Sequence, residues 1–527
     1  AGIAYYKLRD WGRAAWHLRQ AARYDSEHDA ECLRFCGLAE IERKRYWAAY
    51  KTLSEACDCL ESTGYIADKE NAFVTNVLAK RGQTAVGLGL TDEAVSSYSA
   101  ASACAHTLSD RLGMYSSTLM ARHALPWDRE SLLEAHRGYA ALVDKLGIKP
   151  YLEWPHWPHS RLAQGQAGPL RVGLISPDFR QHVMFYFYYQ LLAGHDRKKW
   201  EVYAYSLGEV HDWYTEQVEQ SVAVFRDMHG LELQDIAAQI RADGIDVLVD
   251  LAGHSADSGL PVLAFRPAPV QVSGLGYMAT TGLTQVDAFL TDRWADPPER
   301  ESELVEQPLY LTSQFCYTGR SDVPEPGGAP CLAKGYITFG CFNQYRKITD
   351  EMLQLWRELL RQVPQSRLLL KNGSFRDDET VLLVQERLHR LGLPLGRVEL
   401  EADSSDYMTR YLDVDIALDT YPYTGGGTTC DALYMGVPVI SLYGERRGSR
   451  FGLSILQNAG LGELACADAE AYGAKALALA RDTDLLDVLH KNLRPMLLAS
   501  PLMDTQNYMR ELDAGFRQLA GELGVRR

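Results

Sequence analysis

The strongest structural signal in this chain is Thr420-Tyr-Pro-Tyr-Thr-Gly-Gly-Gly-Thr-Thr-Cys-Asp431. It follows an apolar run, Ile416–Asp419, that is typical of a buried strand, and it leads into a helix-like run, Ala432–Met435. A strand, a glycine loop and a helix start present unpaired backbone N–H groups and the positive end of a helix dipole to an anion. The stretch therefore predicts a phosphate site in an α/β fold, although an ordinary turn between a strand and a helix has the same outline.

Residues within this stretch suit a nucleotide. Gly426 and Gly427 let the backbone approach an oxygen-rich ligand closely. Thr428 and Thr429 add hydroxyl donors in the expected first turn of the helix. Asp431 lies one turn further, where its carboxylate is suited to accept hydrogen bonds from ribose hydroxyls.

Charge and composition limit the classes of function. The 527 residues contain 54 Lys and Arg against 69 Asp and Glu, which gives a net charge of −15. Such an acidic chain is a poor general binder of nucleic acid or anionic membranes, so an anionic ligand needs a local site. Its apolar runs are too short for a membrane span, and ten scattered cysteines are typical of a reducing compartment. We therefore expect a cytoplasmic protein of about three or four domains, with no nucleic-acid or membrane partner.

An alanine pattern runs through the first 155 residues. The offsets Ala-x3-Leu/Tyr-x2-Ala start at Ala14, Ala49 and Ala94, at intervals of 35 and 45 residues. The first interval is close to the roughly 34 residues of a tetratricopeptide repeat (TPR). We expect residues 1–155 to form an all-α, TPR-like superhelical domain, with a generic helical bundle as the alternative. The chain starts at Ala1 in what looks like the middle of a domain, so a processed or longer native N-terminus stays open.

A junction rich in Pro and then Gly, from Pro150 to Gly168, precedes a different pattern. Apolar strands now alternate with amphipathic helices, which predicts two doubly wound, Rossmann-like domains at 156–325 and 326–527 with a linker at 324–330. The expected strands are 170–176, 201–207, 247–252, 270–274 and 288–291, then 336–342, 367–371, 397–401, 416–419 and 438–443. The expected helices include 231–243, 350–362, 380–391 and a closing helix at 504–523. Ligands of such folds bind between the carboxyl ends of the strands.

Loops at those strand ends carry polar candidates in both domains. Lys347 and Gln344 follow the strand at 336–342, where Lys347 suits a diphosphate and Gln344 suits an amide or a ring hydroxyl. His182 follows the strand at 170–176 and suits a general base or an orienting donor, although a lone histidine is more often structural. His254 follows a later strand in the same way.

Two further segments complete the candidate set. The Gly- and hydroxyl-rich segment 266–282, which includes Tyr277, is expected to line the acceptor side together with His254. The string Asp413-Val-Asp415 resembles a metal-binding DxD motif, but it precedes its strand, at the wrong end of the sheet for the cleft. We therefore predict surface charge there and no metal site.

These segments, taken in order, resemble the TPR-containing protein O-linked N-acetylglucosamine transferases, specifically their bacterial members, and they are similar to plant-type protein O-fucosyltransferases. The resemblance runs from about Leu170 to the C-terminus. It rests on Arg171–Phe179 with His182, Leu248–His254, Arg266–Pro269, Phe342-Asn-Gln-x-x-Lys347-Ile348, Leu418–Thr420, Thr428-x-x-Asp431, Val437-Pro-Val and Ser500-Pro501.

The resemblance implies a GT-B fold, with two Rossmann-like domains preceded by the TPR-like superhelical domain. It implies transfer of a sugar from UDP-N-acetylglucosamine to Ser or Thr hydroxyls of a protein or peptide held by the TPR groove and the cleft, with inversion and without metal or other cofactor. By position, Lys347 neutralises the diphosphate, Thr428 and Thr429 lie at its helix N-terminus, and Asp431 binds the ribose. Gln344 contacts the phosphate or the sugar, and His182 faces the acceptor hydroxyl.

Departures from the family pattern leave two alternatives open. The segment 183–189 contains five consecutive aromatic residues, 185–189, where smaller ones are expected. Tyr407 stands where animal members carry a uracil-stacking histidine, and Gly426 replaces another histidine. The glycine loop looks more like that of the fucosyltransferases, whereas Gln344 looks more like the glucosamine enzymes. A GDP-fucose enzyme and a catalytically weak nucleotide-binding scaffold are the alternatives.

Overall fold

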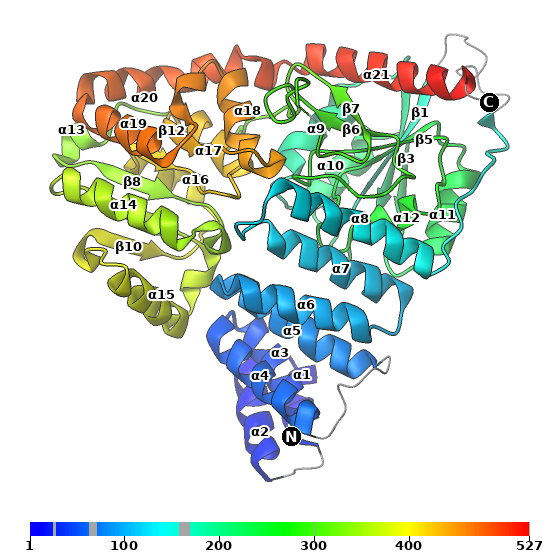
Figure 1. Ribbon diagram of the computed structural model, residues 1–527, viewed down its shortest axis with the longest axis horizontal. Helices are drawn as coiled ribbons and strands as arrows, with labels where there is room; N and C mark the ends of the chain where they lie inside the picture. Colours follow the sequence, from blue (N-terminus) through cyan, green and yellow to red (C-terminus); the bar gives the residue numbers. More distant parts are fainter. Residues whose placement is uncertain (25–27, 63–70, 158–168, 301, 526–527) are drawn as a thin grey trace.

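The computed structural model describes residues 1–24, 28–62, 71–157, 169–300 and 302–525. It consists of an N-terminal helical domain and two α/β lobes (Figure 1). The helical domain contains α1 (Gly2–Lys7), α2 (Trp11–Tyr24), α3 (Asp29–Glu42), α4 (Tyr46–Ser62), α5 (Ala72–Leu88), α6 (Thr91–Cys104), α7 (Leu108–Arg122) and α8 (Arg129–Lys145). Within these described ranges, no helix is long and apolar enough to cross a bilayer.

The alanine pattern marks the close helix contacts of the helical domain. Ala14, Ala49 and Ala94 are fully buried. Four residues after each alanine, a larger side chain packs against a glycine of the preceding helix, where an added Cβ would lie within 2.9 Å of that side chain. The pairs are Gly2–Leu18, Gly37–Leu53 and Gly82–Tyr98. This recurring contact confirms the predicted helical repeat region, because in each repeat a glycine of one helix packs against a large side chain of the next.

The first lobe is a seven-stranded parallel sheet of order β3-β2-β1-β4-β5-β6-β7. Its strands are β1 (Leu170–Ser176), β2 (Trp200–Ser206), β3 (Val224–Asp227), β4 (Val247–Asp250), β5 (Val270–Ser273), β6 (Ala288–Thr291) and β7 (Gln307–Tyr310). Its helices are α9 (Phe185–Ala193), α10 (Trp213–Ser221), α11 (Leu233–Ala242) and α12 (Leu260–Leu263). The sequence prediction missed β3 and β7. Both are edge strands without a fully buried residue, so they lack the continuous apolar run of the central strands.

The second lobe is a six-stranded parallel sheet of order β10-β9-β8-β11-β12-β13. Its strands are β8 (Thr338–Cys341), β9 (Arg367–Lys371), β10 (Val398–Glu401), β11 (Ile416–Leu418), β12 (Val439–Leu442) and β13 (Ala465–Cys466). Its helices are α13 (Cys331–Lys334), α14 (Asp350–Gln362), α15 (Asp378–Arg390), α16 (Tyr407–Arg410), α17 (Gly427–Tyr434), α18 (Phe451–Asn458), α19 (Ala469–Arg481), α20 (Thr483–Leu498) and α21 (Thr505–Val525). Short 3₁₀ turns, η2 (Tyr345–Lys347) to η8 (Pro501–Met503), join several of them. Two such sheets confirm the predicted GT-B architecture.

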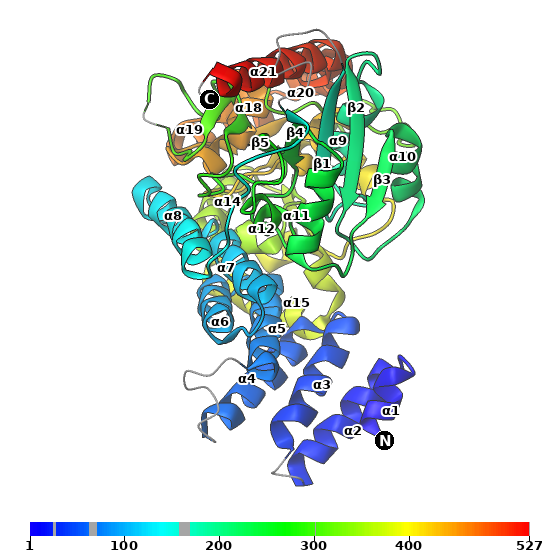
Figure 2. The ribbon, with the colours of Figure 1, turned by 90° about the vertical axis from the view of Figure 1, so that its right-hand side faces the viewer.

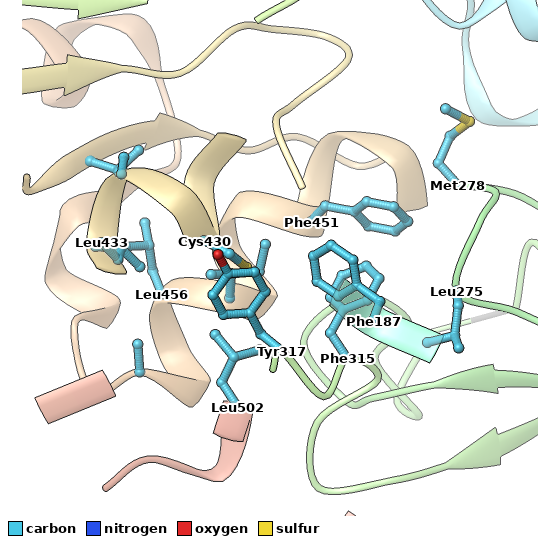
Figure 3. Packing of buried hydrophobic residues seen from close by; sticks show 14 of the residues in the cluster. Phe187, Leu275, Met278, Phe315, Tyr317, Cys430, Leu433, Phe451, Leu456 and Leu502 are labelled. Carbon is cyan, nitrogen blue, oxygen red and sulfur yellow. The ribbon is translucent and has the colours of Figure 1, made fainter. Parts of the chain in front are cut away.

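One hydrophobic core runs through both lobes. Figure 3 shows Phe187 of α9, Phe315 of the segment between the lobes and Phe451 of α18 packed together. Helix α21 begins beside the second lobe and crosses to the first (Figures 1 and 2). There Phe516 stacks on Trp200 with ring centroids 5.3 Å apart. The linker 324–330 lies between the lobes, whereas the predicted Gly-rich junction at 164–168 lies outside the described residues.

Candidate active site

The glycine loop is folded around the buried carboxylate of Asp419, directly after β11. Oδ1 of Asp419 accepts from the N–H groups of Thr420 and Gly425 at 2.8 and 2.7 Å. Oδ2 accepts from Ser441 Oγ at 2.6 Å. Burial raises the pKa of Asp419, and these donors oppose that shift. A carboxylate inside the turn therefore fixes the loop before any ligand arrives.

The loop ends in the N-terminus of α17. Cys430 N–H bonds to Gly426 O at 3.1 Å, so the N–H groups of the three residues before Cys430 are the ones that the helix leaves unpaired. The hydroxyl of Thr428 donates to Asn343 Oδ1 at 2.8 Å. A Cβ on Gly425 would lie 2.6 Å from Thr428 Oγ1 and 2.7 Å from Thr429 Oγ1. Only glycine fits here, and the result is the cradle of amides that the sequence predicted for an anion.

Lys347 lies against this loop from the other side. Its Nζ donates to Thr424 O at 3.0 Å and lies 3.7 Å from the ring centroid of Tyr423. Only 8% of the residue is exposed. Burial, reinforced by the neighbouring Arg346, lowers the pKa of Lys347 to about 7. The ammonium group of Lys347 therefore loses its proton easily in the absence of an anion, because the lowered pKa lies near neutral pH.

The remaining predicted residue of the Lys347 loop lies at the surface. Gln344 is exposed, and its Oε1 accepts from Arg346 Nε at 2.8 Å. Beside the loop, a cavity of about 610 Å³ opens between the helical domain and the second lobe. Trp127, Arg346 and Tyr421 are among its lining residues. The cavity borders Arg346 and Ile348, the two neighbours of Lys347 in the chain.

His182 approaches the same helix end from the first lobe. Its neighbour Val183 touches α17, since a Cβ on Gly427 would lie 2.3 Å from Val183 Cγ2. The N–H of Met184 donates to Nδ1 of His182 at 3.4 Å, and the same Nδ1 lies 3.4 Å from Asp178 Oδ2. Burial lowers the pKa of His182 although Asp178 opposes the shift, so the imidazole is neutral at pH 7. The structure therefore brings His182 and the glycine loop together.

Asp431 and Tyr407 are in contact, as expected for a shared site. Tyr407 OH donates to Asp431 Oδ2 at 2.7 Å. Two residues that the sequence analysis missed also bind this carboxylate: Tyr317 OH donates at 2.6 Å and Arg320 Nε at 3.1 Å, both to Oδ1. Asp431 is 2% exposed. The predicted ribose acceptor is thus already engaged by protein donors.

Two predicted acceptor-side residues do not line a cleft, which corrects that expectation. His254 is 0% exposed and Tyr277 is 1% exposed. His254 Nδ1 bonds to Ser116 Oγ at 2.8 Å, and its Nε2 bonds to Thr281 O at 2.8 Å. Tyr277 OH bonds to His136 of α8. The helical domain covers both side chains. The spacing of residues within the first lobe does not predict this contact with another domain.

The DxD string also departs from its prediction. Asp413 is a half-buried partner of Lys334 and Arg410. Asp415 is fully buried and accepts from the N–H groups of Cys331 and Thr338 at 2.7 Å each. Asp415 therefore links α13 to β8 through hydrogen bonds, and the prediction that it is a surface charge was wrong.

Asn343 and Asp419 were within quoted motifs but had no assigned role. Their positions in the sequence could have indicated a role in the site, because both follow strands that end at the cleft edge. Arg320 gave no comparable signal in the sequence.

The model of glycosyl transferase family 41 matches residues 134–322 and 330–512. The chain belongs to glycosyl transferase family 41. This confirms the resemblance drawn from the motifs, and the matched ranges include every candidate residue above. The family match begins at residue 134, within α8, so it includes most of the last helix of the helical domain.

Several relatives of this chain in the family are plant proteins. The chain is 36% identical over 398 residues to the probable UDP-N-acetylglucosamine–peptide N-acetylglucosaminyltransferases SPINDLY of Hordeum vulgare and Arabidopsis thaliana, which covers 74% of this chain. It is 29% identical over 417 residues to the Arabidopsis thaliana protein SEC, which is also named a probable UDP-N-acetylglucosamine–peptide N-acetylglucosaminyltransferase. The chain spans 41% to 43% of the length of these relatives.

One solved structure is similar over the whole chain. It is a lysine-to-methionine mutant of the Thermobaculum terrenum O-GlcNAc transferase, with a TM-score of 0.86 and 27% identity. The match covers 100% of this chain and 99% of that chain. The arrangement of helical domain and two lobes is therefore shared with a solved member of this enzyme class.

Proposed function

We propose that this chain transfers N-acetylglucosamine from UDP-N-acetylglucosamine to serine or threonine hydroxyls of proteins, with inversion and without a metal or other cofactor. One observation carries the proposal: buried Lys347 bonds to Thr424 O of the glycine loop, three residues before α17 begins with its unpaired amides. Membership in family 41 and the activity named for the SPINDLY relatives support the donor and the peptide acceptor.

In this reaction the acceptor oxygen attacks the anomeric carbon from the face opposite the diphosphate. The bond between that carbon and the phosphate oxygen breaks, and the diphosphate leaves with the electron pair. Lys347 and the α17 amides stabilise that charge, a kind of help often worth several kcal/mol. They supply the positive charge that a metal provides in other enzymes, which is why we propose a metal-free mechanism.

His182 is the group we assign to the acceptor hydroxyl. Nδ1 of His182 has two neighbours at 3.4 Å, the N–H of Met184 and Oδ2 of Asp178. We assign the proton of the neutral imidazole to Nδ1, facing Asp178, at the expense of the long Met184 contact, so Nε2 accepts the proton that the hydroxyl loses. A positioned base contributes about 10²–10⁴-fold. We include the helical domain in acceptor binding because the cavity of about 610 Å³ between it and the second lobe opens beside the Lys347 loop.

A GDP-fucose enzyme is the second candidate, and the loop favours it. A Cβ on Gly426 would meet nothing within 4 Å, so this position leaves room for a different sugar or base. A nucleotide-binding scaffold without turnover is a third reading, drawn from the aromatic residues after His182.

Titration calorimetry with UDP and GDP, followed by transfer of radiolabelled sugar to lysate proteins in EDTA, separates these readings. We expect tighter binding of UDP and transfer of N-acetylglucosamine that Lys347→Met abolishes, because the leaving group loses its cation. Tighter binding of GDP with fucose transfer would replace the donor. Binding without any transfer would leave the scaffold reading.

A further inference from the structure

A short loop of the second lobe reaches into both other domains. This arginine loop, residues 446–450, follows β12 and contains η6 (Arg447–Arg450). Its arginines, Arg446, Arg447 and Arg450, are each at most 8% exposed. Their guanidinium groups donate to His123 O and Leu125 O in the helical domain, to Leu290 O, Thr291 Oγ1, Trp294 O and Gln314 Oε1 in the first lobe, and to Gly444 O in the second. Hydrogen bonds to three domains therefore fix the position of the loop.

Gly448, in the middle of the arginine loop, lies against both other domains. A Cβ at this position would lie 3.0 Å from Met278 Cγ of the first lobe and 3.5 Å from His123 Nδ1 of the helical domain. The carbonyl of Gly448 accepts from the hydroxyl of Thr424 at 3.2 Å. The same hydroxyl accepts from the N–H of Gly452, in the first turn of α18, at 3.4 Å. Because Thr424 belongs to the glycine loop, its side chain joins that loop to the arginine loop.

The main chain of Thr424 faces Lys347. Nζ of Lys347 donates to Thr424 O at 3.0 Å, and within the described residues this carbonyl is the one hydrogen-bond acceptor of the ammonium group. A lysine carries its charge on a flexible four-carbon stem, so the acceptor decides where the charge lies. Thr424 is 0% exposed. It therefore connects the arginine loop, through its hydroxyl, to the charge of Lys347, through its carbonyl.

We propose that Thr424 is a positioning residue: its hydroxyl, bound to the arginine loop, fixes the carbonyl that orients Lys347 toward the leaving diphosphate. The inference rests on the proposed function, in which Lys347 stabilises the charge on that diphosphate. A displacement of about 1 Å in a positioned group can cost about 10²-fold in rate. Thr424 therefore acts on the rate through Lys347 and does not need to contact the substrate.

Three substitutions at this position test the role of the hydroxyl, because Thr424→Val and Thr424→Ala remove it and Thr424→Ser keeps it. Transfer to a fixed amount of lysate protein is measured against donor concentration, with the donor that the wild type uses. We expect the two hydroxyl-free variants to lower kcat about tenfold or more and to keep the KM for the donor within about threefold, because the charge that Lys347 stabilises grows as the bond breaks. Thr424→Ser should keep kcat within about threefold of the wild type.

Thr380→Val is the matched control for the loss of a buried hydroxyl. Thr380 is a 1% exposed threonine of the same lobe, and its hydroxyl donates to Asp377 Oδ2 at 2.7 Å. We expect this variant to keep the kcat of the wild type. Thermal unfolding of all four variants shows which of them are folded, and Thr424→Ala keeps the test available if the valine does not fit against Gly448 O.

The pH dependence of nucleotide binding is a second measurement, which a general loss of stability does not change. An ammonium group that loses its carbonyl acceptor has a lower pKa, because the hydrogen bond favours the charged form. Affinity for UDP or GDP, whichever the wild type binds more tightly, falls above the pKa of Lys347. Calorimetry should therefore show this fall beginning about 0.5–1 pH unit lower in Thr424→Val and Thr424→Ala. Thr424→Ser and Thr380→Val should behave as the wild type does.

The outcomes separate this inference from the function on which it rests. Wild-type kcat in both hydroxyl-free variants would overturn it, and so would a loss of kcat without the change in pH dependence, because Lys347 would then still be held by its carbonyl. A Thr424→Ser variant as impaired as Thr424→Val would show that the hydroxyl is not the cause. If the wild type binds nucleotide and transfers no sugar, the proposed function fails, and the pH dependence alone decides whether Thr424 orients Lys347. A wild type that binds neither UDP nor GDP refutes both.

Discussion

At the scale of single residues, Lys347 is a cation that is only fully charged when its ligand is present. Its pKa is lowered to about 7 by burial, so at pH 8 most of the ligand-free protein carries a neutral lysine. A bound diphosphate favours the protonated form and raises the pKa. Nucleotide binding at pH 8 should therefore take up nearly one proton, and affinity should fall up to about tenfold per pH unit above pH 7.

Calorimetry at pH 8 in buffers of different ionisation enthalpy measures this proton uptake directly. Lys347→Met is the control, since it removes the titrating group while keeping a side chain of similar length, and it should bind UDP weakly without proton uptake. Equal uptake in the variant and the wild type would assign the proton to another group.

At the scale of elements, a directed chain of hydrogen bonds joins α7 and α8 to the first lobe. His136 Nδ1 bonds to the carbonyl of Leu132 at 2.6 Å, so Nδ1 carries the proton. Burial lowers the pKa of His136 to about 4, and its neutral Nε2 therefore accepts from Tyr277 OH at 2.8 Å. The phenol oxygen in turn accepts from His123 Nε2 at 3.0 Å. All three side chains are buried.

Tyr277→Phe should destabilise the protein because it leaves two buried histidine nitrogens without a partner. Each such group costs about 1–3 kcal/mol. Thermal unfolding measures the change, and Tyr310→Phe is the control because Tyr310 is a tyrosine of the same lobe that is 41% exposed. A Tyr277→Phe protein as stable as this control would show that the Tyr277 hydroxyl does not stabilise the contact between the helical domain and the first lobe.

At the scale of the whole molecule, ion pairs and a backbone contact join the helical domain to the second lobe. Glu379 of α15 pairs with Arg45 at 2.6 Å and with Lys51 at 3.1 Å. Ser374 Oγ donates to Gly87 O at 2.6 Å. Because the pairs with Glu379 are each about a third to a half exposed, they contribute at most about 1 kcal/mol.

Glu379→Arg should therefore lower the melting temperature by a few degrees at most and leave UDP affinity unchanged, since the Lys347 loop does not depend on these pairs. Glu386→Arg on the same helix is the matched control. Calorimetry and small-angle scattering follow the affinity and the radius of gyration. A loss of UDP binding in Glu379→Arg alone would mean that the position of the helical domain sets the geometry of the donor site.

The sequence by itself determined the central strands of both sheets, the repeat contacts at Ala14, Ala49 and Ala94, and the glycine loop with Lys347. Apolar periodicity and glycine spacing are patterns of a few residues, so a single sequence is enough to predict the strands, helices and turns that they specify. Tertiary structure alone decided which donors surround Asp431 and what covers His254 and Tyr277. Arg320 meets Asp431 across 111 residues of chain. A buried polar group must form a hydrogen bond with whichever group the fold brings next to it. When that group lies far along the chain, the spacing of residues near the polar group does not predict it.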